Sequence, residues 1–319
     1  RHVISWSSLL SEVQARANWL QSHHIKTLAI LADNSPNWIL WDLAALHSNT
    51  VLVPVPAYFS ALQKKHLLNN AGVEYLLSDQ VNLTEKLDLG LRLVHQTTPI
   101  ASCTYLVHKH LNHRDAPRLH ISTAKVTFTS GSSGEPKGVM LSANQQLRVA
   151  QSLAESLAEL DVKKHDCILP LAILLENIAG VYAPLIAGAS VHTSPMYDVG
   201  IKGSSELDIV TFLTGMRKRS GESLILLPQL LLALVSCIEL GAPLPQKLKF
   251  IAVGGARVSE SLLHRAKAIG LPVYQGYGLS ENASVSTLNS PTSNRVGSVG
   301  RPLAHNQIRI SADGEIQVK

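Results

Sequence analysis

The part of the chain with the clearest chemical content is the segment from Thr127 to Gly138. It places five hydroxyl side chains, three glycines and one lysine within twelve residues, directly after an extended apolar stretch. Glycines let the backbone turn sharply and bring its N–H groups close to a ligand, and hydroxyl groups donate further hydrogen bonds. Lys137 adds a mobile positive charge. Together these groups suit a polyanion, most plausibly a polyphosphate.

Two common loops of similar composition do not fit this segment. The ordinary phosphate loop ends in Gly-Lys-Ser/Thr, whereas here Pro136 falls five residues after Gly131 and no hydroxyl residue follows Lys137. The Gly-x-Ser-x-Gly nucleophile elbow also fails, because Glu135 stands where the last glycine is required. A Ser/Gly-rich surface loop is the simplest alternative, but linkers rarely end in Pro-Lys-Gly between apolar strands.

The stretch from Thr129 to Gly138 resembles the signature loop of the adenylate-forming enzymes. These include acyl-CoA synthetases, firefly-luciferase-like ligases and peptide-synthetase adenylation domains. Their loop typically reads Thr-Ser-Gly-Thr/Ser-Thr-Gly-x-Pro-Lys-Gly, and the match is nearly complete. The resemblance implies that the loop holds the β- and γ-phosphates of ATP. The implied nucleotide-binding residues are Thr129, Ser130, Gly131, Ser132, Ser133, Gly134 and Lys137.

A second segment is similar to the Tyr-Gly-x-Thr/Ser-Glu motif of the same family. An aromatic ring can stack on adenine, and a carboxylate can bind Mg²⁺ beside substrate phosphates. By resemblance, Tyr277 packs on adenine, Ser280 contacts the α-phosphate and Glu281 holds the metal ion. The glycines of the motif are assigned to the nucleotide site as well; they are Gly276 and Gly278. The alternative is a glycine-rich turn whose tyrosine belongs to the core.

The triplet Gly254, Gly255 and Ala256 follows an apolar strand. Ligands of open α/β sheets lie beyond the carboxyl ends of strands, and backbone without bulky side chains can approach a purine edge closely there. Taken alone the triplet is a weak signal, because any strand-to-helix turn can use glycines. The resemblance places these three residues along adenine and the acyl pocket, and they are assigned to the nucleotide site.

The stretch from Leu169 to Asn177 stands in the position of a Leu-Pro-Leu-x-His-x-x-Glu segment, similar to that of long-chain acyl-CoA synthetases. Ile173 replaces the usual histidine or aromatic residue, so the family's acyl gate and thiol tunnel are not carried over. The stretch also lacks the aspartate with which amino-acid-activating members hold an ammonium group, and an unpaired ammonium in an apolar pocket is costly. We therefore expect an apolar carboxylic acid, fatty or aryl. The implied acyl-pocket residues are Ile173, Asn177, Gly180, Gly255 and Gly278.

The resemblance implies a ligase reaction in two steps. A carboxylate attacks the α-phosphorus of ATP and pyrophosphate leaves, after which the acyl group passes to a thiol of coenzyme A or of a carrier protein's phosphopantetheine. Because two anions meet in the first step, charge neutralisation is the main catalytic task. The implied catalytic residues are Lys137, Ser280 and Glu281, the last with Mg²⁺. The alternative is a non-catalytic nucleotide- or acyl-binding module whose natural length is 319 residues.

Short apolar strands alternate with helical stretches along most of the chain, which predicts an α/β fold. We expect stacked, largely parallel sheets flanked by helices, in αβαβα layers, over about residues 1–290. After Ser290, short alternating strands around an Asp-Gly turn predict a hairpin or the start of a small β-barrel over about residues 291–319.

The resemblance covers essentially the whole chain, but it corresponds to the large N-terminal domain of such an enzyme. In the family, more barrel, a hinge and a small mobile C-terminal domain follow, and they carry the ribose-binding aspartate and the catalytic lysine. We therefore expect residues 1–319 to be a fragment that binds nucleotide but adenylates poorly by itself.

The composition predicts a folded protein that does not bind nucleic acid. Hydrophobic residues make up 45% and charged residues 16% of the chain, as in globular proteins. The net charge is +5, but lysines and arginines are scattered. Their densest cluster, Arg217 to Arg219, is interpreted as a solvated loop. The most apolar run, Leu224 to Leu240, contains Pro228 and is short for a transmembrane segment, so none is expected.

The three cysteines, Cys103, Cys167 and Cys237, form no Cys-x-x-Cys pair. With no visible signal peptide, this pattern favours a reducing, cytoplasmic compartment. Fourteen histidines prompt a metal hypothesis. The closest set, near His120, lacks a zinc spacing, so we expect a polar surface connection there instead; its members are His108, His110 and His113.

Overall fold

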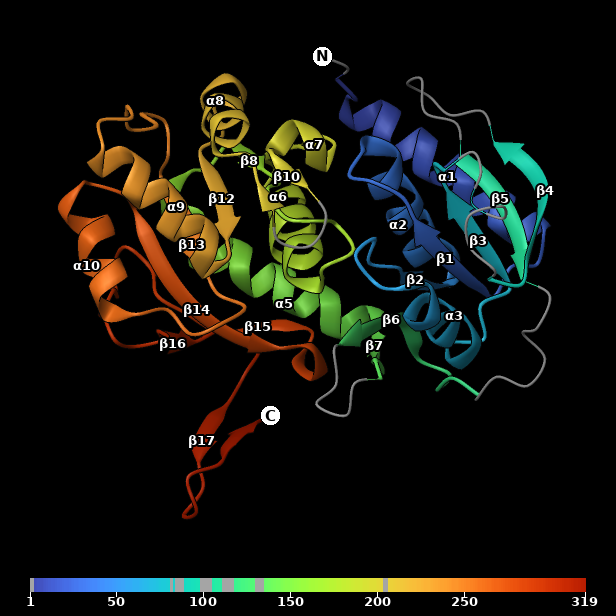
Figure 1. Cartoon of the computed structure of the whole chain (residues 1–319). Helices are drawn as coiled ribbons and strands as arrows, with labels where there is room; N and C mark the ends of the chain where they lie inside the picture. Colours follow the sequence, from blue (N-terminus) through green and yellow to red (C-terminus); the bar gives the residue numbers. More distant parts are fainter. Residues whose placement is uncertain are drawn as a thin grey trace. The chain divides into compact units, whose positions relative to one another are not determined.

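The computed structural model describes residues 3–80, 83, 89–97, 105–110, 118–129, 135–202 and 206–319. The chain forms two compact units, Arg1–Ala143 and Asn144–Lys319 (Figure 1). Each unit contains its own seven-stranded sheet and its own hydrophobic core.

The sheet of the first unit is mixed, in the order β4-β5-β3-β1-β2-β6-β7. The central strands β3, β1, β2 and β6 run parallel, and the outer pairs are antiparallel. All five residues of β1 are buried, as expected for a parallel strand that is covered on both faces. The strands are β1 Thr27–Leu31, β2 Val51–Pro54, β3 Tyr75–Ser78, β4 Leu91–Thr97, β5 Tyr105–His110, β6 Thr123–Thr129 and β7 Lys137–Ser142.

Three helices of this unit begin at a serine N-cap. The serine side chain accepts a hydrogen bond from a backbone N–H group of the first turn, which would otherwise lack a partner. Ser60 and Gln63 add a reciprocal capping box. The helices are α1 Trp6–Ser22, α2 Pro36–Ser48 and α3 Ala61–Asn70. Helix α1 packs on α2, with Trp19 and Trp41 edge to face at a ring-centroid distance of 5.6 Å.

The sheet of the second unit has the order β16-β15-β14-β13-β12-β8-β9. Five strands, from β9 to β14 in this order, run parallel, and β15 and β16 follow antiparallel. The strands are β8 Lys164–Asp166, β9 Ser190–His192, β12 Ser223–Leu226, β13 Phe250–Val253, β14 Val273–Leu279, β15 Ser284–Leu288 and β16 Arg301–Pro302. Two short antiparallel pairs accompany it: β10 Ile201–Lys202 with β11 Glu206–Leu207, and β17 Ile308–Ile310 with β18 Ile316–Val318.

Helices cover both faces of this second sheet. Residues of β12 and β13 pack into one core with side chains of α8, α9 and α10. Helices α5, η2 and α6 line a pocket with other side chains of the same strands. The helical elements are α5 Ala143–Ser156, η1 Ala158–Leu160, η2 Glu176–Tyr182, α6 Ala183–Ile186, α7 Met196–Val199, α8 Ile209–Arg219, α9 Pro228–Glu239, α10 Glu260–Ala268 and η3 Ser280–Asn282. Within the described ranges, every helix is too short or too polar to cross a bilayer.

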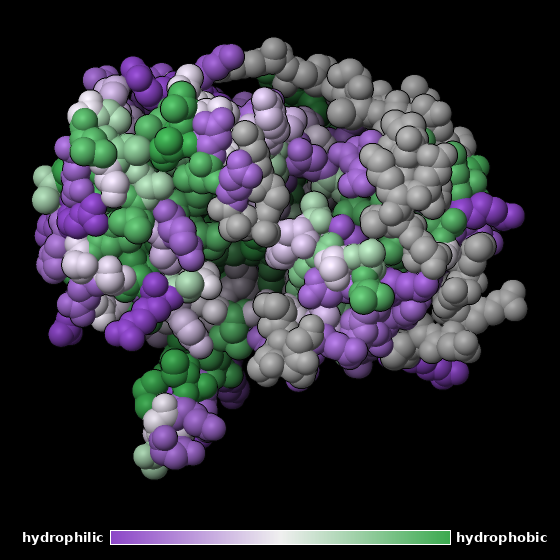
Figure 2. All heavy atoms as spheres, in the orientation of Figure 1, coloured by the Kyte–Doolittle hydropathy of each residue, from purple (hydrophilic) through white to green (hydrophobic). Residues whose placement is uncertain are grey.

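This architecture confirms the predicted α/β class with parallel-rich sheets and flanking helices. The predicted hairpin around Asp313 and Gly314 forms as β17 and β18. It exposes the side chains of Ile310 and Ile316, and hydrophobic surface is visible on the hairpin at the bottom of Figure 2. The barrel and the C-terminal domain stay predictions. One helix differs from expectation, because η2 has the wider π-type hydrogen bonding.

Two predicted surface segments need correction. Arg217 and Lys218 are exposed as predicted, but the cluster is helical and its third member, Arg219, is buried. Arg217 to Arg219 form the last turn of α8, and Arg219 is 5% exposed. Its Nε atom donates to Asp166 Oδ2 at 2.8 Å. His108 and His110 lie in β5 and are each 1% exposed; burial lowers the pKa of His108. The third predicted member of that surface set, His113, lies outside the described residues, as does Cys103.

Candidate active site

The parallel strands β13 and β14 end side by side, and both continue into glycine-rich backbone. Val253 of β13 pairs with Gln275 of β14, so the next residues of the two strands, Gly254 and Gly276, lie side by side. A Cβ atom built at Gly254 would lie 3.4 Å from the carbonyl oxygen of Gly276. Gly255 has a φ angle of +79°, which L side chains rarely adopt. Ala256 is exposed. This edge of the sheet is therefore nearly bare backbone that a flat ligand can approach closely.

Strand β14 is longer than predicted and runs through the predicted adenine motif. The pairing with β15 shifts between Tyr277 and Gly278, and a Cβ atom built at Gly278 would collide with the backbone of Ser284. Only glycine fits there. After the strand, the short helix η3 carries Ser280, which is half-buried, and Glu281, which is exposed. The predicted Tyr277, Ser280 and Glu281 thus follow one another along one edge.

In the first unit, Thr129 and Lys137 face each other at the base of the predicted phosphate loop, because β6 and β7 pair antiparallel. His66 Nε2 donates to the carbonyl oxygen of Pro136 at 3.0 Å and holds the loop's end against α3. Lys137 is exposed and lines a hollow of about 400 Å³ together with His66 and Arg118. The loop residues from 130 to 134 lie outside the described residues, so their contacts stay predictions.

An apolar pocket of about 220 Å³ lies in the second unit between the sheet and helices α5, η2 and α6. Along β13 it is lined by Phe250 and Ala252, which point to the same side of the sheet as Gly254 because strand side chains alternate. Val285 and Leu288 of β15 line it as well, opposite the two glycines of β14. The pocket therefore begins next to the glycine edge and runs toward the amino ends of the strands.

The far end of the pocket is a row of three residues on neighbouring strands. His165, Ser223 and Phe250 are in register across β8, β12 and β13, and all three line the pocket. Phe250 precedes Gly254 by four residues, which is about 13 Å at the usual rise of a strand. The pocket thus has an apolar body and a partly polar end.

The helix η2 contributes a different face to the pocket than the sequence predicted. The lining residues are spaced four apart, as on one face of a helix: Leu175, Ala179 and Ala183. The predicted residues of this segment, Ile173, Asn177 and Gly180, are not part of that lining. Ile173 packs against the hydrophobic core of the second unit, and Asn177 is 1% exposed. Their roles toward an acyl group stay predictions.

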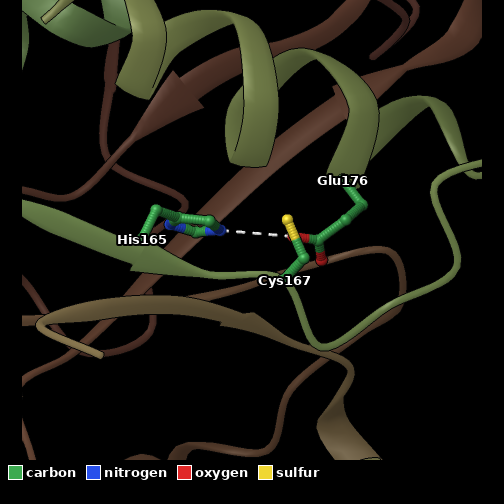
Figure 3. Close-up of side chains that lie close together, drawn as sticks. All are labelled: His165, Cys167 and Glu176. Carbon is green, nitrogen blue, oxygen red and sulfur yellow. Dashed lines mark hydrogen bonds and ion pairs between the residues drawn. The ribbon is translucent and has the colours of Figure 1, made fainter. Parts of the chain in front are cut away.

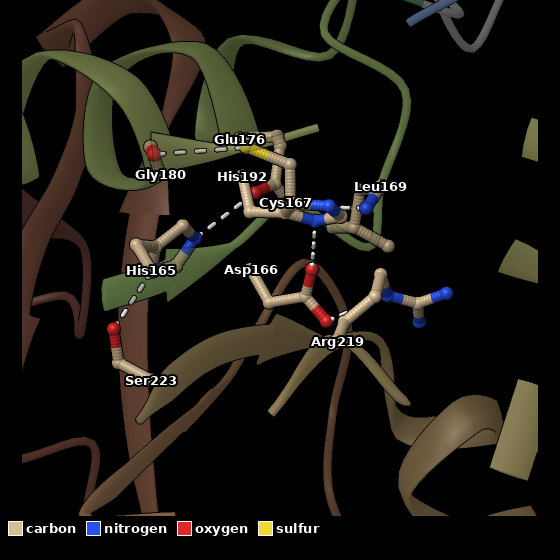
Figure 4. Close-up of polar contacts among 9 residues, drawn as sticks. All are labelled: His165, Asp166, Cys167, Leu169, Glu176, Gly180, His192, Arg219 and Ser223. Carbon is tan, nitrogen blue, oxygen red and sulfur yellow. Dashed lines mark hydrogen bonds and ion pairs between the residues drawn. The ribbon is translucent and has the colours of Figure 1, made fainter. Parts of the chain in front are cut away.

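At the far row, His165 belongs to a buried polar network (Figures 3 and 4). His165 Nδ1 lies 2.9 Å from Ser223 Oγ, and His165 Nε2 lies 3.2 Å from Glu176 Oε1. The backbone N–H of Leu169 donates to the other carboxylate oxygen at 3.0 Å. Since a carboxylate only accepts, His165 donates through Nε2, and its Nδ1 then accepts from the serine hydroxyl.

Gly180 makes room for this network. A Cβ atom built there would overlap Glu176 Oε1 and lie 2.8 Å from His165 Nε2. The thiol of Cys167 lies 3.7 Å from the carbonyl oxygen of Gly180 and donates to it. Burial, with the negative charges of Glu176 and Asp166 nearby, raises the pKa of Cys167 well above its usual value. The thiol therefore keeps its proton near neutral pH.

His165, Cys167 and Glu176 place their ligand atoms within 4.8 Å of one another (Figure 3). In this structure the thiol donates to the carbonyl oxygen of Gly180, and the imidazole lies within hydrogen-bond distance of the Glu176 carboxylate. We interpret the group as a hydrogen-bonded network. It was not predicted from the sequence, although the signal was present: His165 and Cys167 share one face of a strand, and Glu176 and Gly180 are one helical turn apart.

Comparison with known proteins supports the adenylate-forming resemblance. The family model described as "AMP-binding enzyme" matches residues 1–318. A 2-succinylbenzoate–CoA ligase of Geobacillus sp. (strain WCH70) is 27% identical over 259 residues, which is 78% of this chain and 47% of the relative. The ligase of that name from Bacillus subtilis (strain 168) is 23% identical over 326 residues, 98% of this chain and 62% of the relative. The chain thus spans about half to three fifths of these relatives.

Solved structures confirm the fold. The o-succinylbenzoate CoA synthetase of Bacillus subtilis in complex with the acyl-adenylate intermediate OSB-AMP has a TM-score of 0.75 and 22% identity, covering 100% of this chain and 82% of that chain. The inhibitor-bound N-terminal domain of FACL13 from Mycobacterium tuberculosis has a TM-score of 0.76 and 17% identity, covering 98% and 79%. At these identities the likeness carries the architecture alone.

Proposed function

The chain belongs to the AMP-binding enzyme family, and we propose that it carries the nucleotide and acid sites of an enzyme that activates a carboxylic acid with ATP. The first step forms an acyl-adenylate and releases pyrophosphate, and a thiol then takes the acyl group. The observation that carries this proposal is the continuity between the bare glycine edge of β13 and β14 and the apolar pocket on the same side of the sheet.

The glycine edge suits the adenylate half of the intermediate. Adenine lies along Gly254 to Ala256 and stacks on the half-buried ring of Tyr277. Ser280, at the end of the same strand, donates to the α-phosphate. Thr129 and Lys137 face each other across β6 and β7, and the segment between them is the one assigned to the β- and γ-phosphates.

The residues around the phosphates act mainly by neutralising charge, since the attacking carboxylate and the triphosphate are both anions. Glu281 fits a Mg²⁺ site, because its carboxylate is exposed in a turn that Asn282 fixes through bonds to Ser286 Oγ (2.9 Å) and Asn306 Oδ1 (2.8 Å). Bound Mg²⁺ supplies positive charge for the departing pyrophosphate. Lys137 adds a second positive charge, and each charge-assisted hydrogen bond contributes about 1.5–3 kcal/mol.

The acid in this proposal is a monocarboxylic acid with an extended apolar body, fatty or aryl. The polar residues that line the pocket, within the described ranges, are Asp161, His165 and Ser223, and no lysine or arginine lines it. A second carboxylate, as in the 2-succinylbenzoate of the relatives, would lack a cation here and would be costly to bury. The lining therefore favours an acid without a second carboxylate.

Coenzyme A is the proposed acceptor, because the relatives are CoA ligases by name. The phosphopantetheine of an acyl carrier protein presents a similar thiol and is the alternative. We also propose a reducing, cytoplasmic location, with which the free thiols of Cys167 and Cys237 agree.

Thermal unfolding of the chain with non-hydrolysable acyl-adenylate analogues tests the proposal. A ligand that binds only the folded state, at about 100 times its Kd, stabilises it by ~2.7 kcal/mol. We expect a rise in Tm that depends on the acyl group, larger for alkyl or aryl analogues than for the 2-succinylbenzoyl analogue. Stabilisation by ATP and Mg²⁺ without any response to the acyl-adenylates would leave only a nucleotide-binding module.

A further inference from the structure

The far row of the pocket points to the chemistry of the acid's distal end, an inference that rests on the function proposed above. We propose that the acid carries a hydroxyl group about 13 Å from the glycine edge, and that Ser223 accepts a hydrogen bond from it. The proposal follows from the position of Ser223 in the pocket and from the hydrogen bonds that its side chain already makes.

Ser223 has acceptor capacity that the protein does not use. Its oxygen lies 2.9 Å from His165 Nδ1. With a neutral imidazole that donates to Glu176, the hydroxyl donates to Nδ1 and its oxygen keeps two lone pairs. The contacts among the described residues supply no donor to that oxygen. Ser223 is 6% exposed and lines the pocket, so a bound ligand is the group that can supply one.

The hydrogen bonds of His165 to the residues around it set which group donates and which accepts at the polar end of the pocket (Figure 4). The backbone of Leu169 and the ring of His165 both donate to Glu176. The opposite imidazole tautomer would place a lone pair against the carboxylate, which is repulsive. The hydroxyl hydrogen of Ser223 is therefore bonded to His165, and its oxygen is available to the pocket as an acceptor.

This polarity selects among the possible ends of an acyl chain. A distal carboxylate or carbonyl group only accepts, so it would face the lone pairs of Ser223 without a donor. A distal ammonium would lose its hydration with no carboxylate lining that end, since Asp161 is exposed and pairs with Lys163 at 2.5 Å. A methyl end fits the apolar body of the pocket but gives the Ser223 oxygen no donor. A neutral hydroxyl group donates a hydrogen bond to that oxygen.

Matched acyl-sulfamoyl adenosines test this inference. One set carries octanoyl, decanoyl and dodecanoyl groups, and the other carries the ω-hydroxy counterparts. Calorimetry on the whole chain gives the ratio of the two Kd values at each length. For the length that reaches Ser223, we expect the hydroxy compound to bind about two- to tenfold more tightly than its parent, the worth of one neutral hydrogen bond.

Two variants assign the effect to Ser223. Ser223→Ala removes the acceptor, and we expect the ratio to fall to about one, the value for a lost hydrogen bond. Ser152→Ala is the matched control, because Ser152 is also 6% exposed and lies on α5 without lining the pocket. It should leave the ratio unchanged. If Ser223→Ala does not fold, the ratio measured on the unaltered chain still decides.

The outcomes distinguish a failure of the proposed Ser223 contact from a failure of the proposed ligase function. If the parent compounds bind and the hydroxyl group brings no gain at any length, the role of Ser223 is overturned and the ligase proposal stands. A gain that persists in Ser223→Ala also overturns it. If no compound of either set binds, the proposed function itself fails.

Discussion

One buried charged group in each unit is held in a different way. In the first, Lys125 Nζ and Asp42 Oδ1 form an ion pair at 2.8 Å, with side chains 2% and 1% exposed. In the second, the buried Glu176 accepts from His165 and from the backbone of Leu169. The first arrangement joins β6 to α2, whereas the second has one end in a ligand pocket. The first buried charge joins two elements of the fold, whereas the second is linked through His165 to the polar end of a pocket.

The largest effect predicted by this contrast is the removal of Lys125. Burial lowers the pKa of Lys125 and the charge of Asp42 raises it, so the lysine depends on its partner. Lys125→Met leaves Asp42 buried without that cation, and we expect the free energy of unfolding to fall by about 3–5 kcal/mol. Urea denaturation of both proteins measures it.

The double variant Lys125→Met with Asp42→Leu is the control. Because an apolar pair avoids the desolvation of both ions, it should recover most of the lost stability. Exposed ion pairs contribute below about 1 kcal/mol. A loss of unfolding free energy in that range for the single variant would mean that the pair does not hold β6 to α2.

Gly180→Ala disturbs the network of the second unit and should have a smaller effect. The added Cβ atom must displace the Glu176 carboxylate and the His165 ring, and overpacking of this kind costs about 1–3 kcal/mol. Denaturation measures the loss. Adding Glu176→Asp shortens the crowded side chain and should restore part of the stability. Equal stability of Gly180→Ala and the unaltered chain would show that the network rearranges freely.

Sequence reasoning singled out the glycine-rich segments more readily than the pocket. The segments around Lys137, Gly254 and Tyr277 were identified because glycines, hydroxyls and charges at short spacing have few structural uses. The segment of helix η2 was assigned to the acyl pocket, but the helix face that lines the pocket was not identified, because Leu175 and Ala179 are as apolar as any core residue. Which face of a helix meets a cavity depends on tertiary packing, which one sequence does not display.

The same reasoning explains the wrong surface assignments. Arg217 to Arg219 looked solvated because charge clusters usually are, yet Arg219 is drawn inside by Asp166, which lies 53 residues earlier in the sequence. The histidines of β5 are paired with strands β3 and β4. In both places the groups that pair with the buried side chains are remote in sequence. The local composition therefore did not indicate the burial.

Glu281 offers the opposite case, a carboxylate that stays exposed for a ligand. Glu281→Gln keeps the shape but removes the charge, and we expect ATP binding in the presence of Mg²⁺ to weaken on the order of tenfold, the worth of one charge-assisted contact. Stability without ligand should not change. Glu315→Gln, at another exposed glutamate on the hairpin, is the control. Unchanged binding in Glu281→Gln would remove the proposed metal ligand.

The smallest effect concerns the neutral member of the network, Cys167. Its pKa in the folded chain lies well above the ordinary value of 9.0, chiefly through burial. Below that value both states hold the proton. Above it the unfolded chain loses the proton first, so the free energy of unfolding falls with rising pH, by at most about 1.4 kcal/mol per pH unit. Cys167→Ala should remove the contribution of this thiol to the pH dependence of the free energy of unfolding. The lysines titrate alike in the variant and in the unaltered chain. Urea denaturation at about pH 8 and about pH 10 measures the difference. Parallel slopes in the two proteins would mean that the thiol ionises inside the fold, and the network would then hold an anion where we assign a neutral donor.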